Sequence, residues 1–274
     1  MYQPSDSVEF MGVIELSLKD KVALITGGSR GIGASAVRLF HEAGARVAFN
    51  YRSAKTAADT LVEQCGGTGA CAAFEQELST PEEGRILVEK TVAAFGCIDI
   101  LVANHGIWPA NDAPIATLPE EQWHRTLQVN LDSVFGLVQA AAGHMQKQGR
   151  ATPEAAAGHI VLVSSTAGQR GEAFHADYAA SKGALISMTK GLSTELAPLG
   201  IHVNCVAPGW VATEMSASAL DDPQVSKKIL SGIPLRRPAR PIEIAGPILF
   251  LCTPLAGFMS GEIVNVNGGA VLVG

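Results

Sequence analysis

The strongest constraint on the fold of this chain is the run Thr26-Gly-Gly-Ser-Arg-Gly-Ile-Gly33. It follows residues 21–26, a short apolar run without alternation, which is typical of a parallel strand buried on both faces. Residues 34–43 then have the pattern of a helix, and residues 46–50 that of a second strand. Glycines between a strand and a helix let the backbone approach a pyrophosphate at the helix N-terminus. The segment therefore predicts a nucleotide-binding β-α-β unit.

Strand and helix patterns continue to alternate along the chain. Further strands are expected at 69–74, 98–103, 160–164, 202–207 and 262–266, and further helices at 54–65, 81–95, 120–148, 176–197 and 242–251. Such alternation predicts a parallel sheet with helices on both faces. We therefore expect an α/β fold, a single doubly wound domain of Rossmann type with about seven strands.

Three stretches fall outside this alternation. Residues 1–18 precede the first strand and are expected to form an arm, which leaves 19–274 as the domain. Residues 149–158 have the composition of a surface insertion. Residues 217–240 contain three prolines and little helix pattern, and a long irregular segment in a compact domain is typical of a lid, here at about 214–240.

Composition excludes several classes of protein. The chain is 47% hydrophobic and 17% charged, which is not the composition of a disordered protein. A net charge of −6 disfavours nucleic acid and anionic lipid as partners. No apolar run approaches the roughly 18 residues of a membrane span, and the N-terminus lacks a signal-peptide pattern. The five cysteines contain no C-x-x-C pair, so we expect a cytoplasmic protein with free thiols and no metal site.

The end of the second predicted strand bears on the choice of cofactor. An acidic residue there would bind a free ribose 2′-hydroxyl, but this chain has Asn50, Tyr51 and Arg52, and Arg30 lies within the glycine loop. Two guanidinium groups suit a 2′-phosphate. A carboxylate about 4 Å from that phosphate would cost about 4 kcal/mol at an effective dielectric constant of 20. The sequence therefore predicts NADP(H) as the cofactor.

A third cluster has the composition of a proton-transfer site. Tyr178 and Lys182 are four residues apart in a predicted helix and therefore share one face. An ammonium about 5 Å away would lower the pKa of the phenol from about 10 to about 7.6 at a dielectric constant of 20. That pKa suits proton transfer near neutral pH. Ser165 follows a predicted strand, where its hydroxyl could hydrogen-bond a substrate carbonyl.

Together these residues resemble the short-chain dehydrogenase/reductase family, in its single-domain branch, over residues 18 to 270. The residues that match are the glycine loop, Asn130, Ser165, Tyr178, Lys182, Pro208, Gly209 and Thr213. The resemblance is nearest to the 3-oxoacyl-[acyl-carrier-protein] reductases and the sugar dehydrogenases related to them. It implies that Tyr178 is the general acid in reduction and that Lys182 lowers its pKa and holds the nicotinamide ribose. It also implies that Ser165 polarises the carbonyl and that Asn130 holds a water near Lys182.

The same resemblance implies which residues bind the cofactor and the substrate. The cofactor-binding residues are expected to be Gly27, Ser29, Arg30, Gly31, Ile32, Gly33, Asn50, Tyr51, Arg52, Glu77, Leu78, Asn104, Gly106, Tyr178, Lys182, Pro208, Gly209, Val211 and Thr213. The substrate candidates are Trp108, Gln169, His175, Trp210 and Met215. The chain departs from the family where the usual Asn-Asn-Ala-Gly is Ala103-Asn104-His105-Gly106. His105 is either a pocket residue or a packed loop histidine, and with His175 it is the other candidate proton donor.

The sequence thus predicts an NADP(H)-dependent reductase that converts a carbonyl, a 3-oxoacyl group or another ketone, to a secondary alcohol. An NAD(P)-linked sugar or secondary-alcohol dehydrogenase is the alternative among enzymes, and a cofactor-binding regulatory protein is the alternative outside them. Binding alone needs no tyrosine acid, which argues against the regulatory protein. A homotetramer is expected from the resemblance. Docking of an acyl-carrier protein stays open, because one arginine used for it in the family is Leu199 here.

Overall fold

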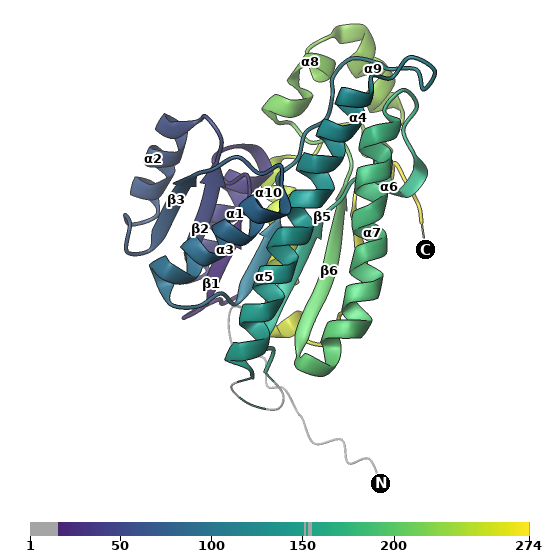
Figure 1. Cartoon of the computed structure of the whole chain (residues 1–274). Coiled ribbons are helices and arrows are strands. Elements are labelled where there is room, and N and C mark those ends of the chain that lie inside the picture. The colour runs from purple at the N-terminus through teal and green to yellow at the C-terminus, as the bar shows by residue number, and fades with distance from the viewer. Residues whose placement is uncertain (1–15, 151, 153–154, 274) are drawn as a thin grey trace, which may run out of the picture.

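The computed structural model describes residues 16–150, 152 and 155–273. Seven parallel strands form one sheet in the order β3-β2-β1-β4-β5-β6-β7 (Figure 1). The strands are β1 (Val22–Ile25), β2 (Arg46–Tyr51), β3 (Cys71–Glu75), β4 (Ile100–Ala103), β5 (Gly158–Val163), β6 (Ile201–Pro208) and β7 (Ile263–Val266). Strand order reverses between β1 and β4, and a ligand crevice is expected beyond the carboxyl ends of strands at such a point. The predicted doubly wound α/β fold is confirmed.

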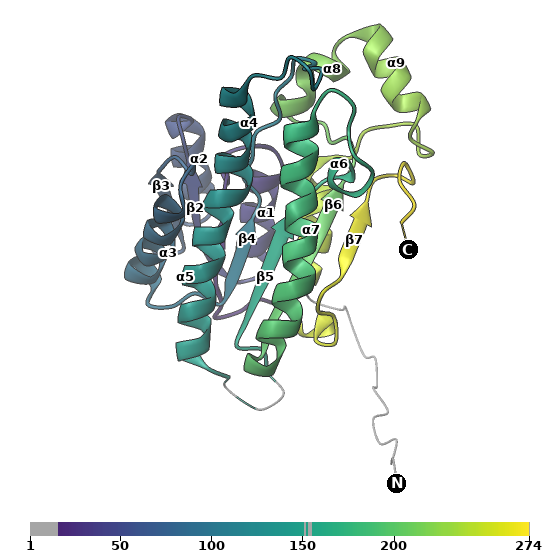
Figure 2. The ribbon, with the colours of Figure 1, turned by 45° about the vertical axis from the view of Figure 1, so that its right-hand side comes forward.

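Helices cover both faces of the sheet (Figures 1 and 2). The first face carries α1 (Gly31–Glu42), α2 (Lys55–Gln64) and α10 (Pro241–Phe250), and the second carries α3 (Pro81–Phe95), α4 (Glu120–Leu127), α5 (Ser133–Gln148) and α7 (Ala176–Leu196). Shorter helices are α6 (Thr166–Arg170), α8 (Ala217–Leu220), α9 (Pro223–Ser231) and the 3-10 turns η2 (Ala197–Leu199), η3 (Glu214–Ser216) and η4 (Pro254–Ala256). Each face has its own apolar core, so the sheet is buried on both sides.

The contact between α3 and α5 is a close approach of two backbones. Thr80 accepts a hydrogen bond from the Glu83 N–H while Glu83 bonds back to Thr80, and Pro81 occupies the first turn, so α3 begins where the sequence predicted. A Cβ at Gly136 on α5 would collide with the Pro81 carbonyl oxygen, and one at Gly84 would collide with the carbonyl of Ser133. Glycine at both positions therefore lets the two helices pack against each other.

Two helical regions differ from the sequence predictions. The helix expected over 120–148 is interrupted by a π-helical turn, η1 (Gln128–Asp132), in which the Ser133 N–H donates to Gln128, five residues earlier. The stretch expected to be helix-poor contains α8 and α9 (Figure 2). Asp222 caps α9 by accepting from the N–H groups of Gln224 and Val225 at 2.8 and 3.0 Å. This cap provides hydrogen-bond acceptors for the first turn of α9. We did not predict this helix because the stretch contains three prolines.

The ends and insertions are described only in part. Most of the predicted arm, residues 1–15, lies outside the described residues, as do 151 and 153–154 of the predicted insertion. Leu18, the last residue of the predicted arm, is buried in the core and its N–H donates to the Ala43 carbonyl. Within the described part of the chain, none of the helices combines the length and apolar character needed to cross a bilayer.

Candidate active site

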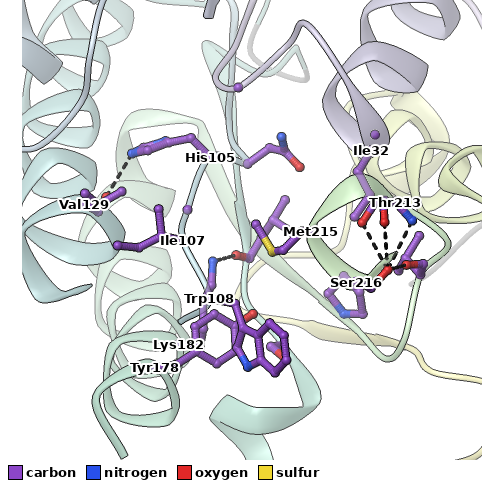
Figure 3. Close-up of a pocket in the computed structure, with 18 of the residues that line it drawn as sticks. Ile32, His105, Ile107, Trp108, Val129, Tyr178, Lys182, Thr213, Met215 and Ser216 are labelled. Carbon is purple, nitrogen blue, oxygen red and sulfur yellow. Dashed lines mark hydrogen bonds between the residues drawn. The ribbon is translucent and has the colours of Figure 1, made fainter. Parts of the chain in front are cut away.

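A cleft of about 540 Å³ runs along the carboxyl ends of the strands, from the glycine loop to α7 (Figure 3). It brings together eighteen of the nineteen predicted cofactor residues, all except Gly33, with the catalytic candidates Ser165, Tyr178 and Lys182. Gly33 lies beneath the loop, where a Cβ would collide with the Gly27 carbonyl oxygen, so its contribution is to packing. Asn130 lies behind the cleft wall and is fully buried.

The glycine loop is held open by a buried side chain from β2. Asn50 is 4% exposed, its Oδ1 accepts from the Gly27 N–H at 2.8 Å, and its Nδ2 donates to the Gln76 carbonyl at 2.9 Å. Gly27 and Gly31 have φ values of +64° and +54°, a region that favours glycine. The Asn50 amide therefore supports the loop, and both ends of it are hydrogen-bonded within the protein.

The first turn of α1 fits an anionic cofactor. Arg30 precedes the helix in an extended conformation, and its side chain makes no capping hydrogen bond. Arg30 thus offers the N–H groups of this first turn no side-chain acceptor, and the turn stands at the cleft wall. A pyrophosphate is the kind of group that such an end binds.

The two arginines expected to bind a 2′-phosphate are paired with carboxylates. The guanidinium of Arg30 lies 2.6 Å from Glu214, and that of Arg52 lies 3.9 Å from Glu77. Glu77 also bonds to Arg125, a cleft residue that the sequence argument missed. The prediction of NADP(H) rested on the two arginines and on the absence of an acidic residue at the end of β2. In the fold, carboxylates from distant segments reach the same arginines.

Tyr178 and Lys182 lie together on α7, at the cleft floor beneath Trp108 (Figure 3). The Lys182 Nζ is 5.9 Å from the centre of the Tyr178 ring and donates to the Val163 carbonyl at 2.9 Å. Ser165 caps α6, accepting from the Ala167 N–H at 3.1 Å, and also hydrogen-bonds the Tyr178 phenol. The arrangement can present two hydroxyl groups to one acceptor atom.

The electrostatics of this pair differ from the sequence prediction. Burial raises the pKa of Tyr178 to about 12, and the Glu172 carboxylate adds to the rise, although the bond to Ser165 opposes it. Burial also lowers the pKa of Lys182 to about 8. Our expectation of a phenol pKa near 7.6 was therefore wrong for the protein's own groups, because it counted the charge of Lys182 and neglected desolvation. Near neutral pH, Tyr178 therefore holds its proton.

Asn130 lies within the π turn, and its side chain is fixed on both sides. Its Oδ1 accepts from the Ile107 N–H at 2.8 Å, and its Nδ2 donates to the Ile107 carbonyl at 3.0 Å and to the Ser181 hydroxyl at 3.1 Å. A Cβ at Gly106 would lie 3.1 Å from the Asn130 Oδ1 and 3.3 Å from the Lys182 Nζ. Gly106 therefore allows Asn130 and Lys182 to approach each other across the loop after β4.

Three of the five substrate candidates line one part of the cleft. Trp108, Trp210 and Met215 line it, with the two indoles edge to face at 5.9 Å. His175 lies behind Trp108, its ring stacked at 4.9 Å, and neither it nor Gln169 lines the cleft.

Two charged residues, Arg170 and Glu172, also line the cleft. They lie between the candidates Gln169 and His175, in a segment expected to contribute to the substrate pocket because it matches the family poorly. Burial raises the pKa of the Glu172 carboxyl, against an opposing hydrogen bond from Trp108. Among the described residues, no cluster of histidine, cysteine and acidic side chains could hold a metal ion.

The fold and this cleft define an α/β oxidoreductase of the nucleotide-binding type, and comparisons with known proteins agree. The family model described as Enoyl-(Acyl carrier protein) reductase matches residues 27–271. The chain is 36% identical over 258 residues to the 3-oxoacyl-[acyl-carrier-protein] reductase of Synechocystis sp., covering 93% of this chain and 99% of that protein. It is 35% identical over 250 residues to the reductase of that name from Staphylococcus aureus, covering 91% and 97%.

Solved structures give the same result. A short-chain dehydrogenase/reductase from Brucella melitensis, described as a glucose/ribitol dehydrogenase, has a TM-score of 0.85 at 33% identity, covering 95% of this chain and 100% of that one. A blue fluorescent protein from a metagenomic library, in complex with NADPH, has a TM-score of 0.83 at 34% identity, covering 93% and 100%. The chain belongs to the short-chain dehydrogenase/reductase family of oxidoreductases.

Proposed function

We propose that the chain is an NADP(H)-dependent reductase that converts a ketone, foremost a 3-oxoacyl group, to a secondary alcohol. The observation that supports this most directly is the half-buried Tyr178 phenol in the cleft. It keeps its proton at neutral pH, bonds to Ser165 and lies beside Lys182 in the cleft that starts at the glycine loop. The names of the curated relatives support the 3-oxoacyl substrate.

The chain's own residues would orient the carbonyl and supply the proton. When bound, NADPH supplies the hydride that reaches the carbonyl carbon. Ser165 donates a hydrogen bond to the carbonyl oxygen, and Tyr178 transfers its proton to the same oxygen as the C=O bond becomes C–O–H. Lys182 stabilises the phenolate that remains, an ionic form that burial would otherwise disfavour. In the oxidative direction the phenolate takes the proton back.

Binding of NADP(H) would use the full length of the cleft. The uncapped first turn of α1 suits the pyrophosphate, and Arg30 and Arg52 stand where they can receive a 2′-phosphate once it displaces Glu214 and Glu77. Two structural neighbours are described with NADPH or NADP bound, which supports the same choice.

The test is turnover with purified protein. NADPH consumption is followed with 3-oxoacyl thioesters on carrier protein or on a small thiol, simple ketones and oxidised sugars. Tyr178→Phe should lower kcat about 10² to 10⁴-fold while leaving NADPH affinity nearly unchanged. Ser187→Ala, at an exposed position of the same helix, is the matched control. Near-normal turnover of Tyr178→Phe would remove Tyr178 as the acid and with it the proposed mechanism.

A sugar or secondary-alcohol dehydrogenase is the second candidate, supported by neighbours described as glucose/ribitol and 2-deoxy-D-gluconate 3-dehydrogenases. The same panel, run in the oxidative direction with NAD or NADP, separates the two. Activity with sugars and none with 3-oxoacyl thioesters would replace the first proposal. Turnover by either route would exclude a purely regulatory cofactor-binding protein.

We further propose a homotetramer and a cytoplasmic location. Phe135 on α5 is 48% exposed, and Leu255 and Phe258, which precede β7, are 62% and fully exposed. Apolar side chains on these elements suit the helix and last-strand pairing that the family resemblance implies. Light scattering at micromolar concentration tests the assembly, and a stable monomer would exclude it. The five cysteines are free thiols, as suits a reducing compartment.

A further inference from the structure

His105 stands where the family's usual pattern has alanine, and its ring bridges two parts of the fold. The ring lies between the end of β1 and the π turn that joins α4 to α5 (Figure 3). Its Nδ1 is 2.7 Å from the Thr26 Oγ1. Its Nε2 is 2.8 Å from the Ser133 Oγ and 3.1 Å from the Val129 carbonyl oxygen. Both ring nitrogens are therefore engaged within the protein.

The partners of the ring fix its proton. A carbonyl oxygen can only accept, so the nitrogen facing Val129 carries the hydrogen. The Thr26 Oγ1 already accepts from the N–H groups of Asn104 at 3.0 Å and His105 at 3.1 Å, which uses both of its lone pairs. Its own proton can go to the Nδ1 at 2.7 Å or to the Val102 carbonyl at 3.4 Å, and the shorter contact assigns it to the Nδ1. The ring is neutral, and a second proton on the Nδ1 would have no acceptor.

The carbonyl that receives the ring is the one released by the π turn. In an α-helix the Ser133 N–H would donate to Val129, four residues earlier, but here it donates to Gln128. Val129 is bonded instead by the Ser133 hydroxyl at 2.8 Å and by His105. The imidazole therefore helps to replace the backbone hydrogen bond that the Val129 carbonyl lacks, next to Asn130.

We propose that His105 is a positioning residue: it fastens the π turn to the end of β1 and so sets where Asn130 lies relative to Lys182. The inference rests on the proposed function, which gives those two residues their roles. A rotated or loosened turn would carry Asn130 away from Ile107 and Ser181, its present partners.

Neutrality of the ring is part of this role. Burial, and then the positive charge of Lys182, lower the pKa of His105 to about 3. An imidazolium at this place would add a second cation near the amine that is to stabilise the phenolate. We therefore do not expect His105 to donate the reaction's proton, because both of its ring nitrogens are bonded within the protein.

The test is a double-mutant cycle between His105 and Asn130. His105→Ala should lower kcat by about 10- to 100-fold, the size expected for a small displacement of a catalytic group, with NADPH affinity nearly unchanged. If His105 acts through Asn130, the double variant with Asn130→Ala should be no slower than Asn130→Ala alone. His144→Ala, on the outer side of α5 where His144 pairs with Glu89, is the matched control. Wild-type kcat in His105→Ala, or losses that multiply in the double variant, would overturn the proposal.

Two further measurements keep the proposal testable if the alanine variant folds poorly. Ser133→Ala removes the hydroxyl that bonds to Val129 and to the His105 ring, but it leaves the bond between His105 and Val129, so it should give a smaller loss. His105→Gln keeps an amide donor for Val129 and should recover part of the rate, so a glutamine variant no better than alanine counts against us. The pH–rate profile should show the same ionisations with and without His105. An ionisation that vanishes in the variant would make His105 a titrating participant.

A readout without turnover separates this inference from the proposed function. Hydrogen exchange of the amides at 128–133 should be faster in His105→Ala than in wild type, whatever the substrate proves to be. Unchanged exchange there would overturn the positioning role. Near-normal turnover of Tyr178→Phe would instead count against the proposed function and leave the exchange result standing.

Discussion

Replacing His159 with asparagine should make the fold less sensitive to acid. His159 is the second residue of β5 and is 8% exposed, with its ring 5.2 Å from that of His202 on β6. Burial, followed by the nearby His202 and Lys21, lowers the pKa of His159 to about 4. Its Nδ1 has no hydrogen-bond partner among the described residues. The folded protein therefore holds this histidine neutral.

The sign and size of the effect follow from the two protonation states. The unfolded chain binds the proton near pH 6.5, whereas the folded chain binds it near pH 4. Above about pH 6.5 this histidine is neutral in both states and does not lower the free energy of unfolding. As the pH falls from about 6.5 toward about 4, the unfolded chain binds the proton and the free energy of unfolding decreases. Between pH 8 and pH 5 a shift from about 6.5 to about 4 lowers the free energy of unfolding by about 2 kcal/mol.

Urea unfolding at pH 8 and at pH 5 measures this loss. The decrease in unfolding free energy between the two should be about 2 kcal/mol smaller in His159→Asn than in wild type. Ser187→Ala, at an exposed position without a titrating group, is the control and should leave the decrease unchanged. His105 is present in all three proteins, so its own contribution cancels. Equal decreases in wild type and His159→Asn would refute the reasoning.

Three other outcomes are expected at the candidate site. NADPH should bind at least about tenfold more tightly than NADH. Arg52→Ala should reduce that preference a few-fold, because it removes one charge-assisted hydrogen bond to the 2′-phosphate. Measured dissociation constants of both cofactors test the two expectations. The reduction rate should be constant between pH 6 and about pH 8 and fall above it as Lys182, with its pKa near 8, loses its proton; a pH–rate profile checks this. Gly33→Ala should abolish cofactor binding or folding, because its Cβ meets the Gly27 carbonyl, whereas Gly143→Ala, with open space around the added atom, should do neither; calorimetry compares them.

Local patterns predicted the fold because each element carries its own signal. The capping box at Thr80 and the glycine at 96 define α3 to the residue, and the glycine loop alone establishes β1, α1 and the nucleotide crevice between them. The pair Asp222-Pro223 is a typical helix start and could have predicted α9. The later prolines led us to expect an irregular segment instead. The π turn carries no such signal, because it is stabilised by tertiary bonds to Val129 and Asn130.

Most residues that line the candidate site were predicted from the sequence, whereas their ion pairs and pKa values were predicted less well. Tyr178, Lys182 and Ser165 meet as expected. The orientation of the Asn50 side chain depends on a hydrogen bond to the Gln76 carbonyl, and the carboxylate that pairs with Arg30 is 184 residues away in the sequence. The local sequence around Asn50 and Arg30 therefore could not predict either interaction. Pairwise charge reasoning also leaves out burial, and burial proved to be the larger effect at Tyr178.

The contact between α3 and α5 has a consequence for how this enzyme can change. Gly84 and Gly136 carry no chemistry, yet Gly84 abuts the carbonyl of Ser133, whose hydroxyl takes part in the hydrogen bonds around the π turn. A methyl group at either glycine would push α5 outward, with the π turn at its start. The tolerance of the candidate site to mutation therefore depends partly on a buried contact between two helices outside the cleft, at positions that a search confined to the cleft would leave free to vary.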